Sequence, residues 1–332
     1  MSRIAKWLAA VVSAAVGPRN GGDPVAQPVS NFRSMLPWFL GGPSRLERLA
    51  EAHGVTTRLL RIGGRTRRYH VYLPDGLTRS RARIVVALQG GGGNALQFVH
   101  AIKAREMSRR FGFVIVAPQG AGWWRWSRRG SWNADSVARL GFAEVKRIDD
   151  IAFIRAVIRN VQTELGLPPA PTYVMGVSKG GMMAYRLTCA LKEEIAAVAV
   201  VAGTMSTDQC GQGANVPLLH IHGEADRNVP LAGGRGAYSA KGSDWPAVAP
   251  GIDLFRRANG IDSEPALVHV TADTVCRRYS NGGEVRVEFC VVENGGHCWP
   301  GIPPLPRHRR RGEYVSQMFD ATTYIAEFVL RH

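Results

Sequence analysis

Two kinds of apolar pattern alternate along the chain. Short continuous runs are typical of strands buried on both faces of a sheet, and apolar residues spaced three or four positions apart are typical of helices with one buried face. The runs predict strands at residues 67–74, 83–90, 113–120, 172–177, 196–203, 216–226 and 285–297. The helical spacing predicts helices at residues 95–112 and 151–165, between residue 178 and Leu191, at 251–259 and from near Tyr314 onward. This alternation predicts an α/β domain with a mostly parallel central sheet and helices on both faces.

The 332 residues divide into three parts. Residues 1–18 begin with basic residues and continue as an uncharged stretch that is too short to span a bilayer and has the layout of a secretory signal peptide. A partly helical extension is the alternative for this segment. Residues 19–50 form an N-terminal extension or linker, and residues 51–332 form one large domain. The signal peptide predicts an extracellular or periplasmic protein, and no other segment is apolar enough to be transmembrane.

A serine stands at a tight turn between a predicted strand and a predicted helix. Residues 176–180 read GVSKG, which is the G-x-S-x-G pattern of a nucleophilic serine in this setting. The glycines let strand and helix approach closely, and the turn projects the Ser178 hydroxyl at the carboxyl end of the sheet. A glycine-rich turn without chemistry is the alternative, but backbone strain of about 1–3 kcal/mol favours a reactive serine.

A serine hydroxyl is a weak nucleophile at neutral pH, so it needs a base and an orienting acid. In α/β hydrolases these residues follow in the order Ser, Asp or Glu, His. Asp226 ends a predicted strand and is the candidate acid, with Glu224 and Asp253 as rivals. His297 lies in the glycine-rich segment ENGGHCWPG and is the candidate base. The histidines within strand-like runs are predicted to be structural, namely His220, His222 and His269.

A second glycine-rich segment, LQGGGGNA, follows the first buried apolar run. Backbone N–H groups of Gly91 or Gly92, together with that of Lys179, are candidates to hold the oxygen of a tetrahedral intermediate. A phosphate-binding loop would need a following Lys-Ser or Lys-Thr, which NALQF lacks. We therefore expect no nucleotide, and the acyl-transfer chemistry needs no metal or organic cofactor.

The formal net charge of +16 is high. The arginines are scattered through segments such as RIGGRTRRYH and RHRRR, without zinc-finger spacing, basic-zipper heptads or alternating basic and aromatic residues. A solvated basic surface is therefore favoured over a specific nucleic-acid partner.

Five cysteines without CxxC spacing argue against a structural zinc. Cys276 and Cys290 flank the turn signal SNGGE, which places them on neighbouring strands of one hairpin. They are either a disulfide, if the chain is exported, or buried free thiols.

Taken in order, the segments resemble the secreted esterase family that holds poly(3-hydroxybutyrate) depolymerases and feruloyl or acetyl-xylan esterases. The resemblance covers residues 57–328. It rests on VVALQGGGGNA, APQG, SWNA, RIDDIAFIRAVI, GVSKGGMMAYRL, VAGTM, HIHGEADRNVPLAGG and GGHCWPG. It implies an α/β-hydrolase fold, with residues 51–332 as the esterase domain.

The resemblance also implies roles for single residues. Ser178 would be the nucleophile, Asp226 the acid and His297 the base, with Gly91 and Lys179 supplying the oxyanion hole. Trp132 and Asn133 match a family segment near the active-site entrance, and by the resemblance they would bind substrate. Asp149 and Asp150 match a pair of residues that opens a long helix in the family, and by the resemblance their role would be structural.

Two positions depart from the family pattern. Gln89 stands where the glycine loop usually begins with histidine, and Lys179 stands where asparagine usually follows the nucleophile. Lys179 keeps its backbone N–H but adds a cation beside Ser178. Both departures bear on rate and on substrate preference.

The tryptophan-rich segment GWWRWSRRGSW has two readings. Its rings either line a substrate cleft or pack in the core and brace the loop. The residues concerned are Trp123, Trp124, Trp126 and Trp132, with Arg125, Arg128 and Arg129 between them.

The favoured function is a serine carboxylic-ester hydrolase. Its substrate would be polyhydroxybutyrate-type polyester or oligomers, or feruloyl or acetyl esters of polysaccharide. A serine peptidase of similar fold and a non-enzymatic protein that binds anionic polymers are the alternatives. The order Ser178, Asp226, His297 argues against the last. No separate substrate-binding domain is visible, which favours soluble oligomers over crystalline polyester.

Overall fold

The computed structural model describes residues 27–28, 54–123, 129–136, 139–167 and 172–332. The signal peptide predicted at residues 1–18 lies outside the described residues, as does nearly all of the linker predicted at 19–50. Five residues of the tryptophan-rich segment also lie outside them, namely Trp124, Arg125, Trp126, Ser127 and Arg128. Among the helices that are described, none has the length and apolar content needed to cross a membrane.

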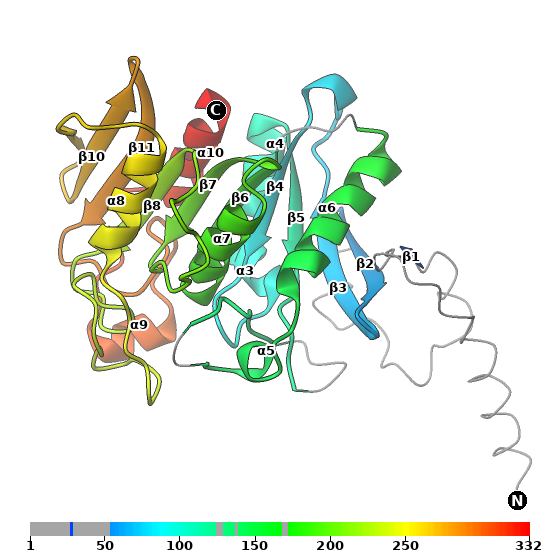
Figure 1. Ribbon diagram of the computed structural model, residues 1–332, viewed down its shortest axis with the longest axis horizontal. Coiled ribbons are helices and arrows are strands. Elements are labelled where there is room, and N and C mark those ends of the chain that lie inside the picture. The colour runs from blue at the N-terminus through cyan, green and yellow to red at the C-terminus, as the bar shows by residue number, and fades with distance from the viewer. Residues whose placement is uncertain (1–26, 29–53, 124–128, 137–138, 168–171) are drawn as a thin grey trace, which may run out of the picture.

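One sheet of 11 strands runs through the described residues, in the order β1-β2-β3-β5-β4-β6-β7-β8-β11-β10-β9 (Figure 1). Six neighbouring strands in the middle of the sheet pair in parallel, namely β5, β4, β6, β7, β8 and β11. The strand pairs on either side of these six are antiparallel. The prediction of a parallel sheet is therefore confirmed for its middle and not for its edges. The bounds are β1 (Gln27–Pro28), β2 (Val55–Ile62), β3 (Arg65–Tyr72), β4 (Arg83–Leu88), β5 (Phe113–Pro118), β6 (Thr172–Val177), β7 (Ile195–Val201), β8 (Leu218–Gly223), β9 (Ala266–Thr271), β10 (Thr274–Asn281) and β11 (Glu284–Val292).

Helices cover both faces of this sheet (Figure 1). Successive side chains of a strand point to opposite faces, so Val86 of β4 packs in one core and Val85 in the other. The first core takes residues from α6, α7 and α8, and the second from α3, α4 and α10. The described helices are α3 (Ala95–Ala101), α4 (Ala104–Phe111), α5 (Phe142–Val145), α6 (Asp150–Leu165), α7 (Lys179–Ala190), α8 (Val248–Ala258), α9 (Pro306–Arg311), α10 (Ala321–Arg331) and the short 3-10 helix at Arg79–Arg81.

The helix predicted at residues 95–112 is in fact two helices, α3 and α4. Lys103 between them adopts a left-handed backbone with φ 54°. The Ile102 carbonyl oxygen accepts a hydrogen bond at 2.8 Å from Thr322 Oγ1 of the C-terminal helix α10. A contact with a residue 220 positions away cannot be read from local apolar spacing.

The last helix begins at Ala321, not near Tyr314 as predicted. The carboxylate of Asp320 accepts from the backbone N–H groups of Thr322 and Thr323, which sets this start. Tyr314 instead forms a parallel bridge with Gly295. Strand β9 at one edge of the sheet and strand β2 next to the other edge were not predicted, because their exposed faces interrupt the apolar run.

Four parallel strands bring the candidate residues to one edge of the sheet. Strand β4 leads into the glycine loop, β6 into Ser178, β8 into Asp226, and β11 into the loop that carries His297. These strands lie side by side with β7 in the sheet order. Because the carboxyl ends of parallel strands share an edge, segments far apart in sequence meet there.

Two disulfides are present among the described cysteines, Cys189–Cys210 and Cys276–Cys290. Cys276 and Cys290 face each other across the antiparallel pair β10–β11, so the disulfide reading of this hairpin holds. The Cys189–Cys210 bond was not anticipated.

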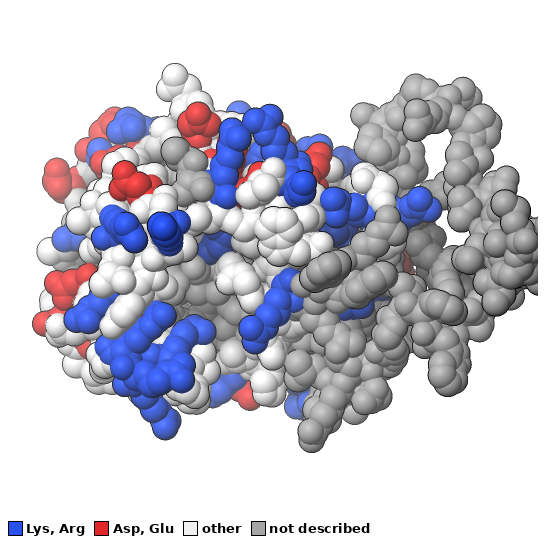
Figure 2. All heavy atoms as spheres, turned by 90° about the horizontal axis from the view of Figure 1, so that it is seen from below, with Lys and Arg blue, Asp and Glu red and all other residues white. Residues whose placement is uncertain are grey.

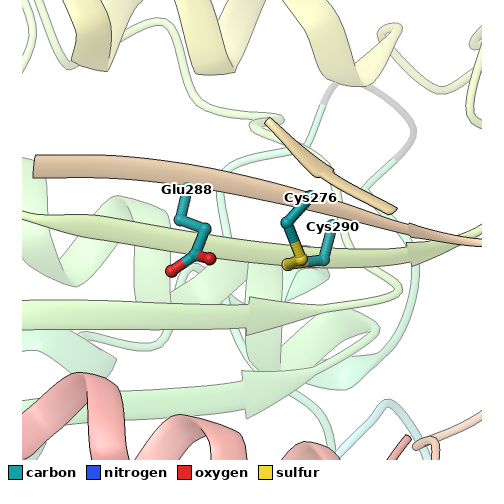
Figure 3. A group of neighbouring side chains, drawn as sticks. All are labelled: Cys276, Glu288 and Cys290. Atoms are coloured by element: carbon teal, nitrogen blue, oxygen red, sulfur yellow. A yellow bond between two sulfur atoms is a disulfide. The ribbon is translucent and has the colours of Figure 1, made fainter. Parts of the chain in front are cut away.

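Figure 3 shows Glu288 beside Cys276 and Cys290. Both sulfurs of this group are used in the disulfide, and Glu288 accepts from Arg278 Nε at 2.6 Å, so the group does not offer a metal site.

Replacing Cys276 and Cys290 together by alanine removes a cross-link between positions 14 residues apart. We expect the free energy of unfolding in oxidising buffer, measured by urea denaturation, to fall by about 3 kcal/mol, because the cross-link restricts the unfolded chain. Cys298→Ala removes a buried thiol outside both disulfides and is the control, with an expected change of about 1 kcal/mol. Equal stability of the double variant and the unmodified protein would contradict this expectation.

Candidate active site

Ser178 occupies a strained turn between β6 and α7. Its backbone has φ 56° and ψ −122°, a region that residues other than glycine rarely adopt. A Cβ atom on Gly180 would lie 2.1 Å from the Leu88 carbonyl oxygen, and one on Gly176 would lie 2.3 Å from the Gly180 carbonyl oxygen. Only glycine allows this approach, and the turn leaves the Ser178 side chain partly exposed at the sheet edge.

Ser178, His297 and Asp226 form one hydrogen-bonded line. His297 Nε2 lies 2.9 Å from Ser178 Oγ, and His297 Nδ1 lies 2.7 Å from Asp226 Oδ2. The structure thus brings together three side chains that are up to 119 positions apart in the sequence. Asp226 is buried, whereas His297 and Ser178 are partly exposed.

The Asp226 carboxylate is held from several sides. Its Oδ1 accepts from the backbone N–H groups of Asn228 at 2.8 Å and Val229 at 2.9 Å. Burial tends to raise the pKa of Asp226, but His297, His222 and the Val229 N–H outweigh burial and lower it below the ordinary value. Asp226 is therefore ionised at neutral pH and faces His297 as a charged acceptor.

The rival acids lie elsewhere. Glu224 is exposed and accepts from the Asn294 backbone N–H at 3.1 Å. Asp253 lies on α8, where its carboxylate is 3.6 Å from Arg256. Neither contacts His297. His269 lies on the edge strand β9, away from the serine.

The glycine loop lies against the start of α7. A Cβ atom on Gly91 would be 3.3 Å from the Lys179 Cβ. Lys179 is the first residue of α7, so its N–H has no partner within the helix. Among the described residues, the Gly91 N–H also has no hydrogen-bond partner. Two free backbone donors thus lie close to Ser178.

Gln89 and Trp132 brace this loop. With the Gln89 amide oriented so that its oxygen faces the Gly120 N–H at 3.0 Å, its nitrogen donates to the Pro118 carbonyl at 3.1 Å. Trp132 Nε1 donates to the Gln89 carbonyl at 2.8 Å. Trp132 is fully buried, so its ring supports the loop from inside and does not line a cleft.

The segment around Trp132 is itself tied down by polar contacts. The Asn133 N–H donates to Asp150 Oδ2 at 2.7 Å, and the Asn133 side chain donates to the Ile148 carbonyl at 2.9 Å. Asp150 is fully buried and pairs with Arg67 at 2.8 Å. The N-cap of α6 is Asp149. These contacts give Asp149 and Asp150 structural roles. They also engage the Asn133 N–H and side-chain amide within the protein.

Lys179 is one half of a buried ion pair that the sequence did not reveal. Its Nζ lies 2.6 Å from Glu144 Oε1 and 2.7 Å from Ser136 Oγ, and both charged side chains are buried. Burial lowers the pKa of Lys179, and Glu144 raises it in part. Glu144 lies in the segment GFAEV, which has no sequence signal of this role. The cation beside Ser178 is thus neutralised and unavailable to a substrate anion.

A basic helix borders the site. Buried His308 of α9 hydrogen-bonds to the His297 backbone, and burial lowers the pKa of His308 to about 4. Arg311 Nη1 donates to Asn228 Oδ1 at 3.1 Å, next to the Asp226 turn. Figure 2 shows a dense group of Lys and Arg side chains at the lower left, in the part of the molecule where Figure 1 places α9. The rim beside His297 is therefore positively charged.

Comparison with known proteins gives relatives in sequence and in fold. The sequence model of the family described as Esterase PHB depolymerase matches residues 67–232, half of the chain. The chain is 28% identical over 284 residues to NocK of Nocardia uniformis subsp. tsuyamanensis, which is described as a candidate esterase, and the match covers 77% of each. It is 29% identical over 188 residues to feruloyl esterase C of Emericella nidulans, covering 54% of this chain and 62% of that protein.

Two solved structures share the fold. The acetyl xylan esterase from Aspergillus awamori superposes with a TM-score of 0.55 at 15% identity, over 77% of this chain and 98% of that one. A dienelactone hydrolase-like promiscuous phosphotriesterase from metagenomic libraries superposes with a TM-score of 0.52 at 13% identity, over 84% and 96%. At these identities, the likeness shows an α/β-hydrolase fold and no more.

Lys179→Met would leave Glu144 buried without its cation. We expect the free energy of unfolding at pH 7 to fall by about 3–5 kcal/mol, because an uncompensated charge remains in the interior. Adding Glu144→Gln should recover much of this loss, and urea denaturation of the single and double variants measures it. Arg155→Met, which removes the half-exposed partner of Glu194, is the control with an expected loss of about 1 kcal/mol or less. Additive losses in the double variant would show that the pair is not coupled.

Proposed function

The chain belongs to the Esterase PHB depolymerase family and is a carboxylic ester hydrolase, and we propose that it acts through a triad of Ser178, His297 and Asp226. The observation that carries this proposal is the placement of His297 between the other two side chains, 2.9 Å from Ser178 Oγ and 2.7 Å from Asp226 Oδ2. A base between nucleophile and acid is the arrangement that activates a serine hydroxyl.

In the proposed reaction, His297 Nε2 takes the Ser178 proton as the hydroxyl oxygen attacks the ester carbonyl carbon. Asp226 accepts from His297 Nδ1–H, which fixes the imidazole tautomer and stabilises the imidazolium. The carbonyl oxygen becomes negative and is held by the N–H groups of Gly91 and Lys179, and one such donor is worth about 3 kcal/mol in the transition state. His297 then gives its proton to the departing alcohol. A water molecule, deprotonated by His297, releases the acyl group from Ser178.

For the substrate, we propose oligomers of hydroxybutyrate type or feruloyl or acetyl esters of polysaccharide. The family description names PHB, and a relative is named as a feruloyl esterase, which supports these two classes. The two disulfides support an extracellular or periplasmic place of action, because structural disulfides persist in oxidising compartments.

Three carboxylate variants and one serine variant test the triad. Asp226→Asn should lower kcat for p-nitrophenyl acetate by about 10⁴-fold, because the amide favours the wrong His297 tautomer. Ser178→Ala should lower it by about 10⁶-fold and abolish labelling by a fluorophosphonate probe. Glu224→Gln and Asp253→Asn are matched controls that remove rival carboxylates and should leave kcat within about threefold. A large loss in either control, with Asp226→Asn active, would reassign the acid.

A substrate panel tests the acyl class. We expect hydrolysis of p-nitrophenyl acetate and butyrate, and of methyl ferulate or hydroxybutyrate trimers, with no cleavage of an N-acyl-peptide anilide. Rates are measured by absorbance or by titration of released acid, each with Ser178→Ala as the blank. Cleavage of the anilide at the rate of the esters would instead assign a serine peptidase.

A further inference from the structure

Three buried side chains form a hydrogen-bonded line that ends at Asp226. Tyr185 Oη lies 2.7 Å from His220 Nδ1, and His220 Nε2 lies 3.1 Å from His222 Nδ1. His222 Nε2 lies 2.8 Å from the Val229 carbonyl oxygen and 3.5 Å from Asp226 Oδ2. All three side chains are fully buried, and the reaction described above uses none of them.

The direction of every hydrogen bond in this line follows from its last member. The Val229 carbonyl oxygen and the ionised Asp226 can only accept, so His222 Nε2 must carry a proton. Burial lowers the pKa of His222, which keeps the ring neutral and makes Nδ1 an acceptor. His220 Nε2 must therefore donate to His222 Nδ1.

The same reasoning continues to Tyr185. Burial lowers the pKa of His220 well below its ordinary value, so this ring is also neutral, and its Nδ1 accepts. Tyr185 must then donate its hydroxyl proton, and burial raises the pKa of Tyr185, which keeps that proton in place. Each donor thus points toward Asp226, and the last N–H lies between Val229 and the carboxylate.

We propose that Tyr185, His220 and His222 are positioning residues for the acid of the triad. Val229 is held twice, because its N–H donates to Asp226 Oδ1 at 2.9 Å and its carbonyl accepts from His222. The turn that carries Asp226 is thereby fixed against β8. Hydrogen bonds in a line strengthen one another in a low-dielectric interior, so the distant Tyr185 hydroxyl contributes to the hold on Asp226.

The line also stabilises the negative charge of the Asp226 carboxylate. The His222 N–H turns its positive end toward Asp226 Oδ2, on which His297 Nδ1 also lies. This stabilises the carboxylate and reduces its pull on a proton of His297. Without His222, the acid limb of the pH profile of kcat/KM should therefore move to higher pH.

Few other titratable groups face this region among the described residues. Burial raises the pKa of the Cys298 thiol to about 12 and lowers that of His308 to about 4. Both therefore keep one protonation state between about pH 5 and pH 9. Glu313, Arg307 and Arg311 also act on Cys298 or His308, and arginine side chains in general stay charged throughout this range. The acid limb of the pH profile of kcat/KM then reports the base of the triad.

The test compares His222→Leu with His222→Gln and measures kcat and KM for p-nitrophenyl acetate from pH 5 to 9. Leucine removes the donor, and we expect kcat to fall by about 10²-fold, as for a displaced catalytic group. We also expect the acid limb to move to higher pH. The glutamine amide nitrogen reaches the position of Nε2, so His222→Gln should recover most of the rate and return the limb toward its original pH.

A milder variant keeps the proposal testable where His222→Leu does not fold. Tyr185→Phe removes one hydroxyl at the far end of the line and should lower kcat several-fold with a smaller shift of the limb in the same direction. Tyr69→Phe is the matched control, because Tyr69 is equally buried and its hydroxyl bonds Asn160 on α6 instead. That variant should leave the limb in place.

Two outcomes overturn the proposal. One is an acid limb that stays in place or moves to lower pH in the folded His222→Leu variant. The other is a Tyr185→Phe profile that equals that of Tyr69→Phe. The proposal rests on the triad assignment, and Ser178→Ala separates the two. An active Ser178→Ala variant would refute the triad. An inactive Ser178→Ala variant together with an unshifted His222→Leu profile would refute only the positioning line.

Discussion

The arrangement of the site depends on one constraint of the fold, the common end of neighbouring parallel strands. Strands β4, β6, β8 and β11 all finish at the same edge of the sheet, and the segment that follows each one carries a part of the site. One close approach is at Gly180, where a single methyl group would collide with the carbonyl oxygen of Leu88. This contact presses α7 against the end of β4 and places the strained Ser178 beside the glycine loop.

Around this edge, the polar groups of the site are held by partners from other elements. Gln89 bonds the end of β5, Lys179 is neutralised by Glu144, and the Asn133 backbone is held by Asp150. The two departures from the family pattern, Gln89 and Lys179, therefore both fall on groups that brace the site from within. A buried ion pair at Lys179 links the start of α7 to the segment of α5, so the position after the nucleophile is held by a charge contact.

A further layer of contacts lies behind the acid. The strand β8 carries two histidines on one face, two positions apart, and both point into the core between α7 and the Asp226 turn. Because every ring nitrogen there has a partner, and the partners of His222 Nε2 can only accept, the protons of the whole line have a single arrangement. A buried network of this kind is costly when a member is missing, which makes the position of Asp226 sensitive to side chains that never meet the substrate.

The sequence by itself determined the strands at the middle of the sheet, because each is a continuous apolar run, and it singled out Ser178, Asp226 and His297, because each follows such a run in a glycine-rich or turn segment. It also indicated, from one turn signal, that Cys276 and Cys290 lie on neighbouring strands of one hairpin. Only the tertiary structure decided the break at Lys103, the start of α10, the Cys189–Cys210 bond and the partners of Lys179 and His222. The physical reason is the same in each case: these features depend on contacts between residues that are distant in the chain or on different elements, and no local pattern of apolar and polar positions records them.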